Sequence, residues 1–310
     1  MTLTNVMTLY LVSCESSCSE RTISGYHDAL VMFFDWLESE KQIVPGKTDV
    51  SVITSDLILD YILYLRNRDI KNTSVATYLR PIRTFFNWCF QEEYLHDRLF
   101  ARVKLPKSDK DVIVPLYQNE VDLIDACFDK STVYGLRNHL IFHLMLDAGL
   151  RSSEVVHLQC SDVMLDKNLL YVYGKGSKYR IVLLCPKLKS LICKYMILVH
   201  QVDLADSLPP DPLLYQKNSL EPLTGRTIVQ LFARLKKQSG VERVHAHLCR
   251  HTFATSYIMG GGNLELLRML LGHYDYSITQ NYLHIANQFL LMDADIYRLD
   301  KVFFKSLYRV

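Results

Sequence analysis

The sequence predicts a mainly α-helical protein of two domains, the second of which contains one small β-hairpin. Three observations support this fold class. Apolar residues recur at helical spacing along most of the chain, an aperiodic segment with two prolines interrupts them near residue 105, and two short β-rich runs flank a Gly-Lys-Gly turn. The 310 residues, 49% hydrophobic and 22% charged, suffice for one large domain or two ordinary ones with buried cores.

Residues 1–104 are predicted to form a small helical domain. Helical periodicity covers residues 20–40, 55–67 and 72–94. The apolar stripe of the first helix consists of Ile23, Tyr26, Leu30, Phe33, Phe34 and Leu37, and that of the third consists of Val75, Tyr78, Leu79, Ile82, Phe85 and Phe86. Packing in a core explains these aromatic stripes better than a ligand site does.

Residues 105–115 are predicted to link the two domains. The stretch that contains them, residues 101–115, has two prolines and no periodicity. It carries four basic side chains against two acidic ones: Arg102, Lys104, Lys107 and Lys110 against Asp109 and Asp111. These charges have two explanations, simple solvation or contact with phosphates where the segment crosses a duplex.

Residues 116–310 are predicted to form a second, mostly helical domain. Helices are expected at 118–130, 135–148, 186–200, 225–239, 247–259 and 263–271. Residues 168–173 and 179–184 are predicted strands, and the turn Gly174-Lys175-Gly176-Ser177-Lys178 joins them in a hairpin. Gly272 is a natural helix stop, and Ser277-Ile278-Thr279-Gln280 has the form of a capping box, so another helix is expected to begin at Ser277.

Charge, cysteine content and hydropathy narrow the class of protein. A net charge of +2 excludes a global polycation but leaves room for a local basic face that binds nucleic acid. The eight cysteines form no CxxC pair and no zinc-finger spacing, which is typical of reduced thiols in the cytoplasm. No signal peptide and no membrane span of about 18 apolar residues is evident. No Asp/Glu cluster suits a metal, so we expect a cytoplasmic protein without membrane, metal or cofactor.

Two basic side chains occupy unusual positions in the predicted structure. Gly149 ends an apolar helix, and Arg151 follows at the start of the next one, where a cation is unfavourable unless an anion binds there. Lys175 stands at the tip of the hairpin between two glycines. Taken singly, each is an ordinary surface cation.

Two further clusters combine histidines with an arginine or a tyrosine. His247, Arg250 and His251 can share one helix face. His273 precedes Tyr282 by nine residues, and the helix break between them lets the second helix fold back beside the histidine. The prediction of an active site rests on an ordered set of residues: Arg, Lys, His-x-x-Arg, Gly-His and Tyr. No member of this set supports the prediction alone.

These clusters resemble the sequence boxes of tyrosine recombinases of the phage-integrase and Xer type. AGLRSSEV resembles the first arginine box, YGKGSKYRIVLL the β-hairpin box, HLCRHTFAT the H-x-x-R box and LLGHYDYSITQNYLHI the last box. The resemblance covers nearly the whole chain, including TISGY and FFDWL in the first domain. It implies a SAM-like core-binding domain followed by a catalytic domain. The catalytic residues that it implies are Arg151, Lys175, His247, Arg250, His273 and the nucleophile Tyr282.

The reaction that the resemblance implies is transesterification of a DNA phosphodiester. Tyr282 is expected to attack phosphorus, form a 3′-phosphotyrosine and expel a 5′-hydroxyl. The expected base is His247, the expected acid is Lys175, and the arginines and His273 are expected to bind phosphate oxygens. Glu154 is expected to support Arg151 rather than to catalyse.

The resemblance also implies partners. They are double-stranded DNA with an inverted-repeat core site and a homotetramer assembled on two such sites, alone or with a paired recombinase. Because only about 100 residues precede the catalytic domain, an Xer-like or mobile-element recombinase is expected rather than a lambda-like integrase. Residues 287–310 are apolar enough to dock on a neighbouring subunit, or equally to close their own core. Two alternatives are a type IB topoisomerase-like nicking-closing enzyme and a non-catalytic DNA-binding protein of the same fold.

Overall fold

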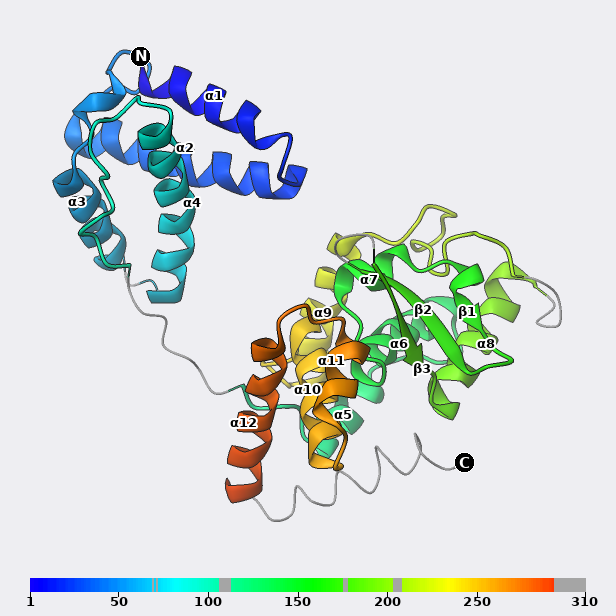
Figure 1. The fold of residues 1–310 in the computed structure, drawn as a ribbon. Coiled ribbons are helices and arrows are strands. Elements are labelled where there is room, and N and C mark those ends of the chain that lie inside the picture. The colour runs from blue at the N-terminus through cyan, green and yellow to red at the C-terminus, as the bar shows by residue number, and fades with distance from the viewer. Residues whose placement is uncertain (69, 71, 106–112, 175–177, 203–207, 293–310) are drawn as a thin grey trace. The chain divides into compact units, whose positions relative to one another are not determined.

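The computed structural model describes residues 1–68, 70, 72–105, 113–174, 178–202 and 208–292 (Figure 1). The chain divides into two compact units, Met1–Asp111 and Val112–Val310. The predicted fold class, mainly helical with one small sheet, is confirmed. Most of the predicted linker, residues 106–112, lies outside the described residues, so its bounds and its contacts stay a prediction.

The N-terminal unit is built from helices around an aromatic core. Its helices are α1 (Leu3–Cys14), α2 (Glu20–Lys41), α3 (Ser55–Arg66) and α4 (Asn72–Gln91), with a 3₁₀ turn at Val50–Val52. Hydroxyl side chains of Thr2, Ser19 and Thr54 accept hydrogen bonds from the first backbone N–H groups of α1, α2 and α3. The aromatic stripes of α2 and α4 meet in the core, where Phe33 and Phe86 pack edge to face.

The second unit contains the remaining helices and the sheet. Its helices are α5 (Gln118–Asp125), α6 (Val133–Leu146), α7 (Ser152–His157), α8 (Pro186–His200), α9 (Gly225–Ser239), α10 (Ala246–Met259), α11 (Leu264–Leu271) and α12 (Tyr276–Met292), with a 3₁₀ turn at Cys160–Asp162. Helix α6 is buried from Gly135 to Leu146 and packs against α8 and α10. Helices α10, α11 and α12 pack together on one side of this unit (Figure 1).

The sheet has three antiparallel strands in the order β1-β2-β3. They are β1 (Val163–Met164), β2 (Leu169–Gly174) and β3 (Lys178–Leu183). Gly174 pairs with Lys178 at the end of the β2–β3 hairpin, as the glycine-rich turn predicted. The turn itself, residues 175–177, lies outside the described residues, and so does Lys175.

The predicted start of the last helix is wrong. Gly272 ends α11 with a φ of 62°, as expected, but α12 begins at Tyr276, one residue before the expected Ser277. The Asp275 carboxylate accepts a hydrogen bond from the Ser277 N–H at 2.8 Å and therefore caps the helix in place of the serine hydroxyl.

All eight cysteines are free thiols. Within the described residues, no helix is both long and apolar enough to cross a membrane. Residues 293–310, which include most of the segment expected to dock or to close the core, lie outside the described residues.

Candidate active site

A buried carboxylate organises three arginines at the start of α7. Arg151 precedes α7, its backbone N–H donates to Glu154 Oε2 at 2.6 Å, and its guanidinium donates to Oε1 at 2.8 Å. Arg180 of β3 donates to both Glu154 oxygens, at 2.6 and 2.9 Å. Arg250 of α10 lies 3.8 Å from Oε2. Burial alone would raise the pKa of Glu154, but the arginines outweigh it and lower that pKa.

Arg250 is locked from several sides. Its Nη1 donates to the Gly149 carbonyl and its Nη2 to the Leu271 carbonyl, both at 2.6 Å. Nη2 also donates to Nε2 of His273 at 3.1 Å. Burial lowers the pKa of Arg250 to about 9, so the guanidinium remains charged at neutral pH. Because this buried cation has few contacts with solvent, it can form strong charge-assisted hydrogen bonds with an anion.

Tyr282 lies between two imidazoles. Its ring stacks on His273 with a centroid distance of 6.1 Å and an interplanar angle of 9°, and the ring of His251 lies 5.4 Å away on α10. His273 Nδ1 is 3.0 Å from the Thr279 hydroxyl. Because Arg250 only donates, Nε2 of His273 is an acceptor and its Nδ1 carries the proton. Burial raises the pKa of Tyr282, while the charges of Arg250 and Arg151 oppose that rise.

His247 lies in the first turn of α10, and its side chain is partly exposed. Partial burial and the neighbouring charges of Arg250, His245 and Arg151 lower the pKa of His247, so its imidazole is neutral at pH 7. The structure therefore places five of the six predicted residues around one site in the second unit, and Lys175 lies outside the described residues.

The sequence placed His251 on the helix face of His247 and Arg250 but gave it no catalytic role, and Arg180 was not predicted to belong to the site. Arg180 is the inward residue of β3 between exposed Tyr179 and Ile181, so its two-residue alternation was the available signal. For His251 the signal was its position four residues after His247 on α10. Neither signal identifies the residue that each side chain contacts. Arg180 meets Glu154, and His251 meets Tyr282, only through the tertiary fold.

Comparison with known proteins identifies the class to which this helical fold and this set of arginine, histidine and tyrosine side chains belong. The phage integrase family matches residues 115–288, and its SAM-like domain matches residues 2–105. The chain belongs to the phage integrase family, and within it resembles the Xer recombinases. It is 28% identical to the tyrosine recombinase XerC of Bacillus licheniformis over 92% of this chain and 93% of that protein. It is 30% identical to XerC of Bacillus pumilus, over 89% and 90%.

Solved structures share the fold. The Tn1549 transposon integrase in complex with a circular intermediate DNA aligns with a TM-score of 0.71 at 16% identity, covering 94% of this chain and 99% of that one. A lambda integrase dimer bound to a core site aligns with a TM-score of 0.71 at 18% identity, covering 91% and 95%. XerH bound to a palindromic difH substrate aligns with a TM-score of 0.70 at 20% identity, covering 89% and 80%.

Proposed function

We propose that this chain is a site-specific recombinase that cuts and rejoins duplex DNA through a 3′-phosphotyrosine on Tyr282. The observation that carries the proposal is a buried phenol flanked by imidazoles, next to arginines gathered on one carboxylate. The chain shares its family with the XerC recombinases, and the XerH and lambda integrase structures hold DNA. Residues 1–104 would bind the core site, residues 105–115 would link the domains and residues 116–310 would catalyse.

In the proposed first step, the Tyr282 oxygen attacks the scissile phosphorus. The P–O bond to the 5′-oxygen breaks, and the phosphate stays attached to the tyrosine, so the bond energy is kept for rejoining. Burial holds the phenol protonated in the free protein, and a base must therefore take its proton. His247 is neutral at pH 7 and is our candidate for that base.

The arginines would stabilise the negative charge that develops on phosphorus. Arg250 is held by two carbonyl groups and by His273, and Arg151 keeps its guanidinium partly exposed beside it. Paired charge-assisted hydrogen bonds to non-bridging oxygens are strongest when the donors are preorganised. Glu154 positions both arginines and does not contact the substrate in this proposal.

His273 would change partners when a phosphate binds. In the free protein its Nε2 accepts from Arg250, so it cannot donate to phosphate from that atom. A phosphate oxygen that takes the Arg250 N–H frees Nε2, and the Thr279 hydroxyl can then donate to Nδ1. After its ring proton has exchanged with water, His273 carries a proton on Nε2, and this N–H donates a hydrogen bond to a phosphate oxygen. Lys175 would supply the proton that the leaving 5′-oxygen needs.

The proposed setting is the cytoplasm, and the proposed assembly is a homotetramer on two inverted-repeat sites, alone or with a paired recombinase. The XerH and lambda integrase structures, one on a palindromic substrate and one a dimer on a core site, support recognition of paired sites. DNA affinity would come largely from phosphate contacts.

Covalent trapping on fragmented genomic DNA of the source cell tests this function. The reaction is stopped with SDS, protein-bound fragments are isolated and their ends are sequenced, with Tyr282→Phe as the matched control. We expect ends clustered at one inverted-repeat site, lost in the variant while DNA binding is retained. Attachment through the exposed Tyr274 or Tyr276 would overturn the assignment of Tyr282. Scattered ends lost in the variant would favour the topoisomerase-like alternative.

A further inference from the structure

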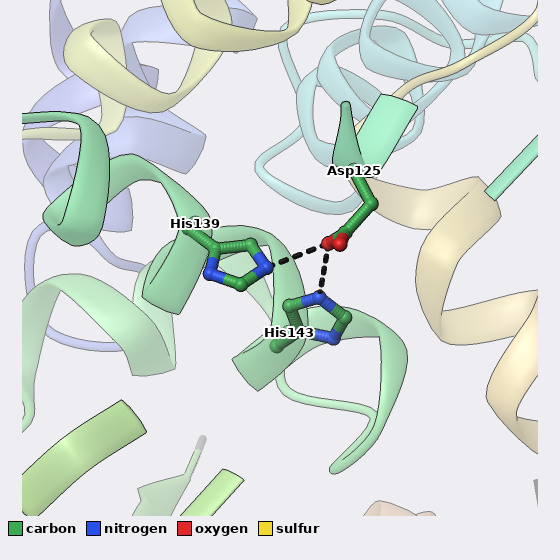
Figure 2. Close-up of side chains that lie close together, drawn as sticks. All are labelled: Asp125, His139 and His143. Atoms are coloured by element: carbon green, nitrogen blue, oxygen red, sulfur yellow. Dashed lines mark hydrogen bonds and ion pairs between the residues drawn. The ribbon is translucent and has the colours of Figure 1, made fainter. Parts of the chain in front are cut away.

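A second polar cluster lies between α5 and α6. Asp125 is the last residue of α5, and His139 and His143 are separated by one turn of α6, so both imidazoles point to the same carboxylate (Figure 2). One ligand atom from each residue lies within 4.8 Å of the other two. Both histidines are almost fully buried, at 3% and 1% exposure, whereas the Asp125 side chain is 23% exposed.

The two oxygens of Asp125 have separate partners. Oδ1 faces Nε2 of His139 at 2.6 Å and Nε2 of His143 at 2.8 Å. Oδ2 accepts from the Lys130 ammonium at 2.6 Å. The two imidazole nitrogens and Oδ1 thus lie within 4.8 Å of one another, and the other carboxylate oxygen is engaged by Lys130. Two imidazoles and a monodentate carboxylate form a common ligand set for zinc.

The surroundings of the cluster have the features of a metal-binding site. Nδ1 of His143, the nitrogen that faces away from Asp125, is 2.8 Å from Asp147 Oδ2. A carboxylate on the far nitrogen of a ligating histidine fixes its tautomer and orients its ring. The rings of Phe128 and Phe142 lie 5.2 Å from His139 and His143, so the nitrogens sit in an apolar shell. The family's reaction uses none of these residues.

We propose that Asp125, His139 and His143 bind a divalent transition-metal ion of the zinc class through Oδ1 and the two Nε2 atoms. Ligand atoms about 2.1 Å from a tetrahedral ion lie about 3.3 Å from one another. The 2.6 and 2.8 Å separations must therefore widen by about 0.5–0.7 Å as the ion replaces the shared protons. Because the Asp125 side chain is 23% exposed, we expect a water molecule as the fourth ligand.

Metal binding would clamp α5 onto α6 next to the active site. Helix α6 ends at Leu146, and Asp147 is followed four residues later by Arg151. His143 contacts both Asp125 and Asp147. An ion bound to its Nε2 would therefore hold in place the C-terminal end of α6, which leads directly to Arg151. Zinc is therefore expected to raise the melting temperature of the full chain, because it binds the folded state.

The test is a zinc titration of the full-length protein against a chromophoric chelator. We expect one site in the wild type, and at least a tenfold loss of affinity in Asp125→Asn and in His139→Gln. The matched control is His27→Gln, an exposed histidine 3.3 Å from Asp28, which should keep wild-type affinity. Asp147→Asn removes only the negative charge of the outer partner and should weaken binding about tenfold. Equal affinity in the wild type, Asp125→Asn and His139→Gln would overturn the proposal.

A direct view of the ligands keeps the proposal testable if a variant fails to fold. X-ray absorption of the wild-type protein with one equivalent of zinc should report nitrogen and oxygen neighbours without sulfur. Sulfur in the first shell would place the ion on the cysteines, for example Cys160 beside His200, and would overturn the assignment. A wild type that binds no zinc in the titration would also overturn it.

Discussion

At the scale of single residues, Glu154 determines how the cationic site is held together. Three arginines, one preceding α7 and the others from β3 and α10, lie within 4 Å of its two oxygens. We predict that Glu154→Gln lowers the free energy of unfolding by about 3 kcal/mol, because it leaves buried cations without their counter-charge. Misplaced arginines should also slow DNA cleavage by about 100-fold. Denaturant unfolding and single-turnover cleavage measure the two effects.

The control for Glu154→Gln is Glu265→Gln. Glu265 also pairs with an arginine three residues away, Arg268, but both lie at the surface. Exposed pairs contribute little to stability, so this variant should unfold like the wild type. A positioning role for Glu154 further requires that DNA binding is weakened much less than cleavage. Equal losses in binding and cleavage would contradict that role.

Two histidines at the site predict acid sensitivity. Burial, with the charge of Arg250, lowers the pKa of His273 to about 3, and burial, with the nearby His247, lowers that of His251 to about 4. In the unfolded chain both protonate near pH 6.5. The unfolded state therefore binds more protons below pH 6.5, and stability is complete above that pH and falls as pH drops toward the folded pKa values.

Unfolding in urea between pH 7 and pH 4 measures this effect. The double variant His251→Gln, His273→Gln should show a smaller loss of stability over that range than the wild type. His284→Gln, which changes an exposed histidine of α12, should lose as much as the wild type. A double variant with an unchanged pH profile would mean that other groups cause the acid sensitivity.

Lys175 is assigned from the sequence alone, since it lies outside the described residues. As the acid that protonates the leaving oxygen, it should contribute about 10²–10⁴-fold to cleavage. We predict that Lys175→Ala is slow on normal DNA and recovers most of the rate on DNA with a 5′-bridging sulfur, because a thiolate leaves without a proton. Lys178→Ala, in the same hairpin, is the control. No recovery in Lys175→Ala would assign the lysine to strand positioning.

At the scale of elements, Gly149 joins the end of α6 to α7 in a way that only glycine allows. Its φ is +64°, and an added Cβ would lie 2.6 Å from the Phe253 ring. Gly149→Ala is therefore predicted to cost about 3 kcal/mol, from the left-handed backbone and the clash together. The Gly149 carbonyl also accepts a hydrogen bond from Arg250, so a shift of this backbone should displace the guanidinium and slow cleavage.

Gly240→Ala separates the two causes. Gly240 ends α9 with a φ of +72°, but nothing lies within 4 Å of its added Cβ. It should cost only about 1 kcal/mol, the backbone part of the effect. Thermal unfolding of both variants gives the comparison, and equal costs would show that the contact with Phe253 relaxes freely.

Elements whose periodicity is strong were predictable, and those that depend on tertiary contacts were not. The bounds of α9 agree with the prediction residue for residue, because its polar and apolar positions alternate at helical spacing. Helix α1 was not predicted, although Leu3, Val6, Met7 and Tyr10 have helical spacing, because apolar Leu9 and Val12 interrupt its exposed polar face. The first turn of α12 depends on Asp275, which competes with Ser277 as the cap, and the local pattern alone does not decide between them.

The same division applies to the site. The resemblance to recombinase boxes named its catalytic candidates, but it did not reveal that Glu154 is shared by arginines from three elements. That fact depends on the packing of β3 and α10 against α7, which no spacing in the sequence encodes. The His139–His143 pair was visible as an i,i+4 spacing, but its carboxylate partner comes from another helix.

At the scale of the whole molecule, each unit has its own core. One apolar cluster lies within residues 3–105, and the others lie within residues 113–285. Fragments 1–111 and 112–310 are therefore expected to fold separately, each with a cooperative thermal transition. This expectation makes the fragments usable for a test of how the units share DNA binding.

We predict that the intact chain binds its core site 10²–10⁴-fold more tightly than either fragment, because the first unit to bind raises the effective concentration of the other. If both units bind DNA through phosphates, the salt dependence of the affinity can also be predicted. The logarithm of affinity falls linearly with the logarithm of salt concentration, by about 0.9 per phosphate neutralised. The slope of the intact chain should then approach the sum of the two fragment slopes, as measured by fluorescence anisotropy on labelled DNA. If fragment 112–310 matched the intact chain in affinity and slope, residues 1–111 would make no phosphate contacts, and the proposed core-binding role of the first unit would be wrong.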